Sequence, residues 1–105
     1  MKSAAVEVVY RDLDSSALLN QMISKKLEKL NRFTDQIVHS RIVLDTPHNH
    51  KRKGKQFRAS IEIDIKGNPI AVTQDHESIH IAVRDVFNTA ERKIKQLSAK
   101  QRTIY

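Results

Sequence analysis

Alternation of apolar and polar residues over positions 57–66 is the feature that most constrains the fold of this chain. The apolar set is Phe57, Ala59, Ile61, Ile63 and Ile65, and the polar set is Arg58, Ser60, Glu62, Asp64 and Lys66. Because the side chains of a strand point alternately to its two faces, this spacing predicts a half-buried strand. A strand of this kind is typical of an antiparallel sheet that has one covered face and one solvated face.

Three further segments are predicted to complete a sheet with this strand. The valine-rich residues 5–10 predict a first strand, and residues 37–44 predict a second. The alternation of this second strand predicts one face with Val38, Ser40, Ile42 and Leu44 and another with His39, Arg41 and Val43. Residues 67–69, Gly-Asn-Pro, supply turn chemistry, so residues 70–73 are predicted to form a short fourth strand that pairs back onto 57–65.

Two amphipathic helices are predicted from apolar residues that recur at three- and four-residue intervals. The first should begin near Ser15 or Ser16, since serine is a favoured cap. Its apolar stripe is Leu19, Met22, Ile23, Leu27 and Leu30, closed by Phe33. The second should begin near Asp75 or Glu77 and fray after Lys100. Its stripe is Ile79, Ala82, Val83, Val86, Phe87, Ala90, Ile94 and Leu97.

The predicted order of elements is β-α-β-β-β-α, which defines an α+β fold. Because a helix joins the first two strands, we expect these strands to be parallel neighbours. Both helices should then pack on one face of a four-stranded mixed sheet. A chain of 105 residues suits one modest core, so we expect a single domain over residues 1–105.

Positive charge is the clearest indication of function, because 19 lysines and arginines face only 12 acidic residues, for a net charge of +7. Residues 47–55 contain four cations and no acid, and they are predicted to form a loop at the end of the hairpin made by the second and third strands. These cations are Lys51, Arg52, Lys53 and Lys55. Nucleic acid is the commonest polyanion that such a loop can meet, and a merely solvated loop is the alternative.

The two predicted helices carry further cations outside their apolar stripes. Those of the first helix are Lys25, Lys29 and Arg32 on one flank, with Lys26 inside the stripe, where its ammonium must extend outward along its own stem. Those of the second helix are Arg84, Arg92 and Lys95 opposite the stripe and Lys100 nearer its edge. For Lys25, Lys29 and Lys95, an ordinary solvated helix surface is the alternative to an RNA contact.

Several classes of function are disfavoured by the sequence. The chain has no cysteine, which excludes disulfides, cysteine-bound zinc and thiol catalysis and suits the cytoplasm. No apolar stretch is long enough to span a membrane, so we expect no membrane partner. His48 and His50 lie beside cations whose charge opposes the binding of a metal ion. Residues 75–77 are interpreted as the start of a helix and not as residues for general acid–base catalysis. We therefore expect no catalytic residue, metal site, cofactor or small-molecule substrate.

The distribution of aromatic and acidic residues indicates which surface meets nucleic acid. Only five aromatic residues are present, and the three phenylalanines fall on apolar stripes, which disfavours recognition by base stacking. Glu62 and Asp64 on the polar face of the third strand would repel a phosphate backbone. The helices and the basic loop are therefore the better candidates for contact with RNA.

Residues 26–33 form a segment with the pattern basic-Leu-x-Lys-Leu-x-basic-aromatic. In the second helix, Ala82-Val83 is followed by Arg84-Asp85-Val86-Phe87, Ala90, Arg92 and Ile94, and residues 47–54 contain Pro-His-x-His and Lys-Gly. Together with the order of elements, these patterns resemble a short, divergent branch of the ribosome hibernation-promoting factor family. Its members are also called ribosome-associated inhibitors or ribosomal subunit interface proteins.

The resemblance implies a non-enzymatic protein that binds the small ribosomal subunit and its rRNA. Such a protein would overlap the mRNA and tRNA sites between head and body and silence idle ribosomes under stress or in stationary phase. By position, the residues that match family RNA contacts are Arg11, Lys26, Lys29, Arg32, Arg92 and Lys100. Long family members add a dimerisation domain, whereas this chain ends at Tyr105, so we expect a monomer off the ribosome.

Two other functions remain open at this point. A general duplex-RNA-binding module shares the plan of a sheet with two helices. A regulator that binds an acidic protein partner would also use a cationic surface of this kind.

Overall fold

The computed structural model describes residues 5–34, 36–46 and 56–103, with side chains up to residue 97. The elements in chain order are β1 (Ala5–Arg11), α1 (Ala17–Phe33), β2 (Ile37–Asp45), β3 (Phe57–Ile65), β4 (Asn68–His76) and α2 (Ile79–Thr103). The four strands form one sheet in the order β1-β2-β3-β4. β1 pairs with β2 in parallel, and the other two pairs are antiparallel. The predicted β-α-β-β-β-α order and mixed sheet are confirmed.

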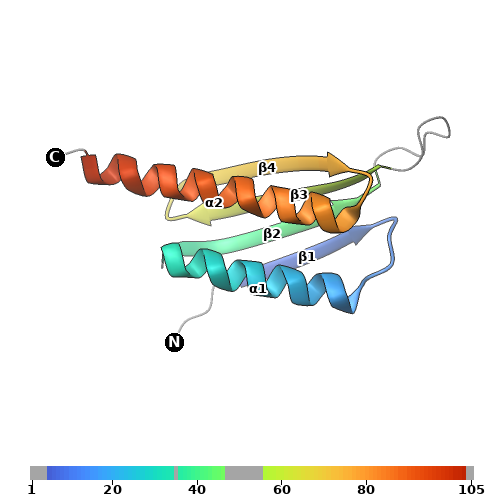
Figure 1. Ribbon diagram of the computed structural model, residues 1–105. Coiled ribbons are helices and arrows are strands. Elements are labelled where there is room, and N and C mark those ends of the chain that lie inside the picture. The colour runs from blue at the N-terminus through green and yellow to red at the C-terminus, as the bar shows by residue number, and fades with distance from the viewer. Residues whose placement is uncertain (1–4, 35, 47–55, 104–105) are drawn as a thin grey trace.

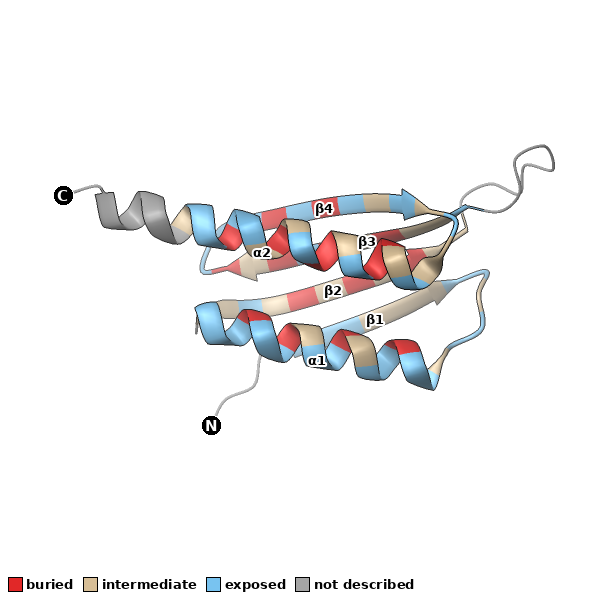
Figure 2. Cartoon of the chain, viewed as in Figure 1, coloured by how far each residue is buried: buried red, intermediate tan, exposed pale blue. Residues whose placement is uncertain are grey.

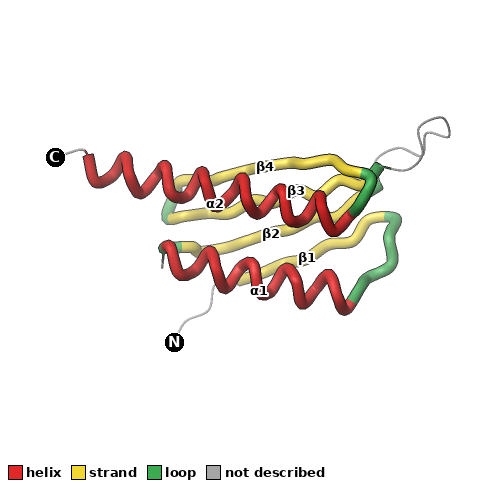
Figure 3. The backbone as a smooth tube through the Cα atoms, viewed as in Figure 1, coloured by secondary structure: helices red, strands yellow, loops and turns green. Residues whose placement is uncertain are grey.

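Both helices lie side by side on the same face of the sheet and leave its other face open (Figure 1, Figure 3). α1 runs alongside β1 and β2, whereas α2 runs alongside β3 and β4 and extends past the end of the sheet (Figure 1). The fold therefore has two layers, a helix layer and a sheet. We call the uncovered side of the sheet the open face.

The core lies between these two layers, as Figure 2 shows by the buried positions on the inner sides of the helices and along β2 to β4. The alternation of β3 places Ala59, Ile61 and Ile63 in this core with almost no exposed surface. The buried residues of α1 are Leu19, Ile23, Leu27 and Leu30, and those of α2 are Ala82, Val83, Val86, Phe87, Ala90 and Ile94. Burial of these apolar stripes is what holds each helix on the sheet.

The start of α1 agrees with the prediction and is fixed by two polar contacts. Ser16 is the N-cap, and its Oγ accepts a hydrogen bond from the backbone N of Leu19 at 3.2 Å. The hydroxyl of Tyr10 at the end of β1 lies 2.9 Å from Oδ1 of Asn20. The first turn of α1 is therefore tied both to its own cap and to β1.

The turn between β3 and β4 differs from the prediction. It is formed by Lys66 and Gly67, with φ angles of 46° and 87°, and not by residues 67–69. Positive φ at both central residues is the signature of the two-residue turn whose twist matches a hairpin. β4 accordingly begins at Asn68 and is longer than the predicted 70–73. Pro69 is tolerated within it because β4 is an edge strand, where a missing N–H leaves no ladder bond unmade.

The start of α2 was predicted too early, because residues at the end of β4 resemble an acidic helix cap. Asp75 and His76 belong to β4, where they pair with Arg58 and Phe57 of β3. α2 begins at Ile79, and the Oγ of Ser78 accepts a hydrogen bond from the backbone N of Ile81 at 3.3 Å. The helix continues to Thr103, beyond the predicted end near Lys100.

One residue of β2 was assigned to the wrong face. Val38 was predicted to share a face with Ser40, Ile42 and Leu44, but it is 52% exposed because the pairing of β2 with β3 shifts between Ile37 and His39. A bulge of this kind interrupts the alternation of side chains. Ser40, Ile42 and Leu44 share one face as predicted and are buried, and the Ser40 hydroxyl has no hydrogen-bond partner among the described residues.

Candidate nucleic-acid interface

Charge is divided unequally between the two layers of the fold. The segments that form α1 and α2 contain ten lysines and arginines against three acidic residues. The four strands contain three arginines against five acidic residues. Because both helices cover the same face of the sheet (Figure 1), the positive excess of the helix segments belongs to that side of the sheet.

The flank of α1 that was predicted to carry its cations faces α2. Lys25, Lys29 and Arg32 are all exposed, and their spacing of four and three residues places them along one side of the helix. Lys29 reaches across to α2, which identifies this side as the one nearer the second helix. Lys26 is half-buried, as expected for a lysine whose stem lies along the apolar stripe.

The outward side of α2 carries a second set of cations, in addition to those of α1. Arg84, Arg92, Lys93 and Lys95 are exposed. Arg84 contacts the neighbouring Asp85, with a distance of 3.3 Å between Nη2 and Oδ1. Within the described part of the chain, Arg92 and Lys93 have no carboxylate within ion-pair distance, so their full charge is available to a partner.

A carboxylate that sequence analysis did not single out lies between the two rows of cations. Glu91 of α2 contacts Lys29 of α1 at 3.5 Å and Lys95 of its own helix at 3.1 Å. The hydrogen bond from Lys95, with a smaller contribution from the charge of Lys29, holds the pKa of the Glu91 carboxyl below its usual range. The four-residue spacing of Glu91 and Lys95 on a helix was the available sequence signal for one of these contacts.

These residues line a groove between the helices. The groove has a volume of about 320 Å³, and its walls are Lys29, Asn88, Glu91, Arg92 and Lys95. We call this the interhelix groove. The ammonium of Lys95 also lies 4.6 Å from the centre of the Phe33 ring, a cation–π contact that limits its motion. The groove thus offers N–H donors from both helices to an anion at the surface.

The open face has a different electrostatic character, because each of its arginines lies beside or opposite an acidic residue. Arg58 Nε lies 2.8 Å from Asp75 Oδ1, and Arg41 Nε lies 3.5 Å from Glu7 Oε1. The guanidinium of Arg58 lowers the pKa of Asp75 by hydrogen bonding and by its charge. The register also places Arg11 opposite Asp45. Cross-strand pairs of opposite charge stabilise a sheet and leave little net charge for a distant polyanion.

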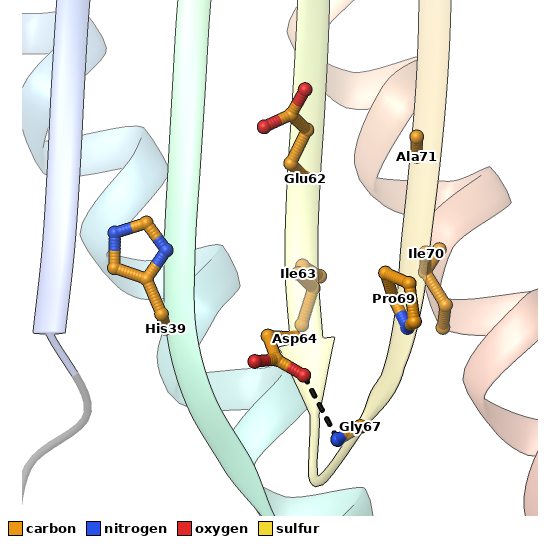
Figure 4. A pocket seen from close by; sticks show the side chains of 8 residues that line it. All are labelled: His39, Glu62, Ile63, Asp64, Gly67, Pro69, Ile70 and Ala71. Atoms are coloured by element: carbon orange, nitrogen blue, oxygen red, sulfur yellow. Dashed lines mark hydrogen bonds between the residues drawn. The ribbon is translucent and has the colours of Figure 1, made fainter.

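The hollow on the open face is acidic. It has a volume of about 410 Å³ and is lined in part by His39, Glu62 and Asp64, with no lysine or arginine among its lining residues. Figure 4 shows the carboxylates of Glu62 and Asp64 on β3 beside the His39 ring on β2. A phosphate would be repelled at this place, as the sequence predicted for these two acidic residues.

The structure brings most, but not all, of the predicted RNA-binding residues together. Lys25, Lys26, Lys29, Arg32, Arg84, Arg92 and Lys95 belong to the helix layer. Lys100 lies in α2, and its side chain is outside the description. Arg11 lies at the end of β1, where alternation after the core-packed Tyr10 places it on the open face, apart from the helix cations. The predicted loop cations Lys51, Arg52, Lys53 and Lys55, with His48 and His50, fall outside the described residues.

Two further observations bear on the class of protein. Among the described residues, no cluster of three or more His, Asp or Glu side chains could hold a metal ion. A helix with the length and hydropathy needed to cross a membrane does not occur in that part of the chain.

The fold and the site define a two-layer α+β domain with a cationic helix layer and an internally paired open face. The chain belongs to the Sigma 54 modulation protein / S30EA ribosomal protein family, whose sequence pattern matches residues 6–102. This is a family of non-enzymatic, ribosome-associated proteins, so the expectation that the chain is not an enzyme is confirmed. The resemblance found in the sequence is confirmed as well.

A curated relative is the ribosome hibernation promotion factor of Deinococcus radiodurans, which is 28% identical over 90 residues. The match covers 86% of this chain and 47% of the relative, so the chain spans about half the length of that protein. The relative therefore contains a large part that has no counterpart in the match.

Two solved structures have the same fold. The N-terminal domain of protein Y from Thermus thermophilus superposes with a TM-score of 0.76 at 22% identity, over 90% of this chain and 99% of that domain. A ribosomal subunit interface protein from Coxiella burnetii superposes with a TM-score of 0.73 at 15% identity, over 90% and 98% of the two chains. At these identities the likeness establishes the fold alone.

Proposed function

We propose that this protein binds the small ribosomal subunit through its helix layer and silences translation by occupying the channel for mRNA and tRNA. The observation that carries the proposal is the unequal division of charge, with ten cations against three acids in the helices and three against five in the strands. Family membership and the name of the Deinococcus radiodurans relative support a ribosomal partner.

The physical basis of binding is the neutralisation of rRNA phosphates by a rigid set of cations. The exposed cations of the helix layer that lack an ion pair among the described residues are Lys25, Arg32, Arg92 and Lys93. Each phosphate that a protein neutralises releases condensed counterions, so affinity falls as salt rises. With about four such contacts, affinity should drop about a hundredfold between 50 and 200 mM salt.

Silencing in this proposal is steric and involves no chemistry. A folded domain in the channel excludes mRNA and tRNA from the volume that it occupies, and the base-paired or tightly folded rRNA around it supplies phosphates at fixed positions. The protein needs no cofactor or small-molecule substrate for this role. As part of the proposal, it acts in the cytoplasm as a single domain that is monomeric off the ribosome.

Cosedimentation with purified small subunits over a series of salt concentrations tests the proposal. We expect salt-sensitive association, and Arg92→Ala should lower the slope of log affinity against log salt by about one unit. Equal affinity for bare duplex RNA and for subunits would support a general duplex-RNA-binding module instead. Association with cell extract that survives nuclease treatment would support an acidic protein partner. Failure to bind subunits at low salt would contradict the proposal.

A further inference from the structure

Glu91 is the feature of the helix layer that simple phosphate binding does not explain. Among the described residues, its carboxylate is the one acidic group that lines the interhelix groove, where an RNA-binding surface would gain most from cations alone. The side chain is only 18% exposed, whereas its partners Lys29 and Lys95 remain 57% and 55% exposed. The Glu91 side chain is therefore more buried than the two lysine side chains that contact it.

The geometry gives Glu91 two opposing effects on an approaching phosphate. It holds Lys29 of α1 and Lys95 of α2 at 3.5 and 3.1 Å, so that two flexible side chains from different helices are fixed at one place. Each ammonium has three N–H donors, so donors remain for a phosphate. The carboxylate also repels any phosphate that reaches these lysines, because it lies within a few ångströms of both.

These two effects act differently on different RNAs. A bare duplex or a flexible strand can adjust to lysines in many positions, so it gains little from their being fixed and is still repelled. A rigid rRNA site with phosphates in matching positions gains from lysines whose rotamers are already set, since less side-chain entropy is lost on binding. Glu91 repels the phosphates of both kinds of RNA equally. Only at the rigid site does the smaller loss of lysine side-chain entropy offset this repulsion.

We propose that Glu91 is a specificity-determining residue of the helix layer, which weakens binding to RNA in general and positions Lys29 and Lys95 for the phosphates of one folded rRNA site. This inference rests on the proposed function, because it requires the helix layer to be the RNA-binding surface. Glu91 contributes to discrimination between partners and lowers the gross affinity of the surface.

A purely structural role for Glu91 predicts a different pattern. If the carboxylate only linked α1 to α2, its removal would lower stability and would change binding to all RNAs by the same factor. Exposed ion pairs of this kind contribute little to stability, at most about 1 kcal/mol. The ratio of subunit affinity to duplex affinity therefore distinguishes a specificity role of Glu91 from a structural one. A measurement of stability alone does not distinguish them.

The test compares Glu91→Gln with wild-type protein on a bare RNA duplex and on purified small subunits. For the duplex we expect affinity to rise about fivefold and the salt slope to steepen by about one unit, because two cations lose their neutralising partner. For subunits we expect affinity to change by less than about twofold, or to fall, because the lysines lose their fixed positions. The ratio of subunit to duplex affinity should thus fall.

Glu28→Gln is the matched control, since Glu28 is exposed on α1 and forms no ion pair with any described residue. It makes the same change in net charge, and its effects on the two affinities should be small and equal. Glu91→Asp keeps the negative charge, so its affinity for the duplex should stay within about twofold of the wild type. Thermal unfolding of each variant checks that the fold is retained.

An equal change in both affinities for Glu91→Gln, or a change no larger than that of Glu28→Gln, would overturn the inference. Failure of the wild-type protein to bind subunits would instead overturn the proposed function. The two failures are distinguishable because the first compares a variant with the wild type, whereas the second concerns the wild type alone.

Discussion

The helix layer and the open face are built from the same short chain, yet they carry charge in opposite ways. On the open face the arginines are matched by acids across the strands, as in Arg58 with Asp75 and Arg41 with Glu7. In the helix layer the cations outnumber the acids, and one carboxylate, that of Glu91, forms ion pairs with two lysines. Matched charges stabilise a surface that meets water, whereas an unmatched positive excess attracts a polyanion that can neutralise it.

The two faces should therefore respond differently to the same change of charge. Arg32→Gln with Arg92→Gln removes two cations from the helix layer, and Arg41→Gln with Arg58→Gln removes two from the open face. We expect the first pair to lower affinity for small subunits about a hundredfold, since each lost charge-assisted contact costs about a factor of ten. The second pair should change affinity less than about threefold. Cosedimentation at a single salt concentration measures both.

An equal loss of affinity in the two double variants would show that only net charge matters. The distinction between the faces would then be wrong. A larger loss in the open-face variant would reverse the proposed orientation.

The β3–β4 turn should affect stability and leave binding unchanged. Gly67 has a φ of 87°, and a Cβ there meets no atom within 4 Å, so Gly67→Ala should cost about 1 kcal/mol through backbone strain alone. Lys66 also has positive φ, and asparagine tolerates that conformation better, so Lys66→Asn should stabilise by about 0.5 kcal/mol. Urea unfolding measures the free energies, and subunit affinity of either variant should stay within twofold of wild type.

Among the described residues, one buried side-chain hydroxyl in the core between the layers lacks a hydrogen-bond partner. Ser40 is fully buried on β2, and in the described part of the chain its Oγ has no hydrogen-bond partner. Replacing it with alanine removes an unsatisfied hydroxyl, so Ser40→Ala should leave the free energy of unfolding unchanged or raise it by up to about 1 kcal/mol. A loss of more than about 1 kcal/mol in urea unfolding would mean that the hydroxyl has a partner, such as a buried water.

The stabilisation by the Arg58–Asp75 ion pair of the open face should be present at neutral pH and lost in acid. Arg58 lowers the pKa of Asp75 in the folded protein, so the pair stabilises above the unfolded-state pKa and the stabilisation is lost as pH falls through the folded-state pKa. Both side chains are well exposed, so the effect should be well below 1 kcal/mol. In unfolding measured between pH 7 and pH 2, the stability difference between wild type and Asp75→Asn should shrink in acid. A difference that grows in acid would have the wrong sign.

Much of the fold follows from periodicity in the sequence. The stripes of α1 and α2 and the alternation of β3 each have one apolar side, which is sufficient to predict two helices on one face of a sheet. Errors arose where two local signals compete. Asp75 and His76 resemble a helix cap, but pairing with β3 draws them into β4. The bulge that exposes Val38 leaves no mark on the pattern of residues.

The candidate site was less accessible from sequence than the fold. Helical spacing was enough to place Lys25, Lys29 and Arg32 on one flank of α1. It could not show that this flank faces α2, because the relative rotation of two helices depends on tertiary packing. The contact of Glu91 with Lys29, which joins residues 62 positions apart, was therefore invisible, and Arg11 was grouped with cations that lie on the other face.

Thiol accessibility in the bound state tests the orientation of the protein most directly. The chain has no cysteine, so a single cysteine can report on each face: Asn88→Cys in the interhelix groove and Ala71→Cys on the open face, both at exposed positions. Binding to small subunits should slow modification of the cysteine at position 88 at least tenfold and leave the one at position 71 reacting within about twofold of its free rate. Protection of position 71 with free reaction at position 88 would contradict the account.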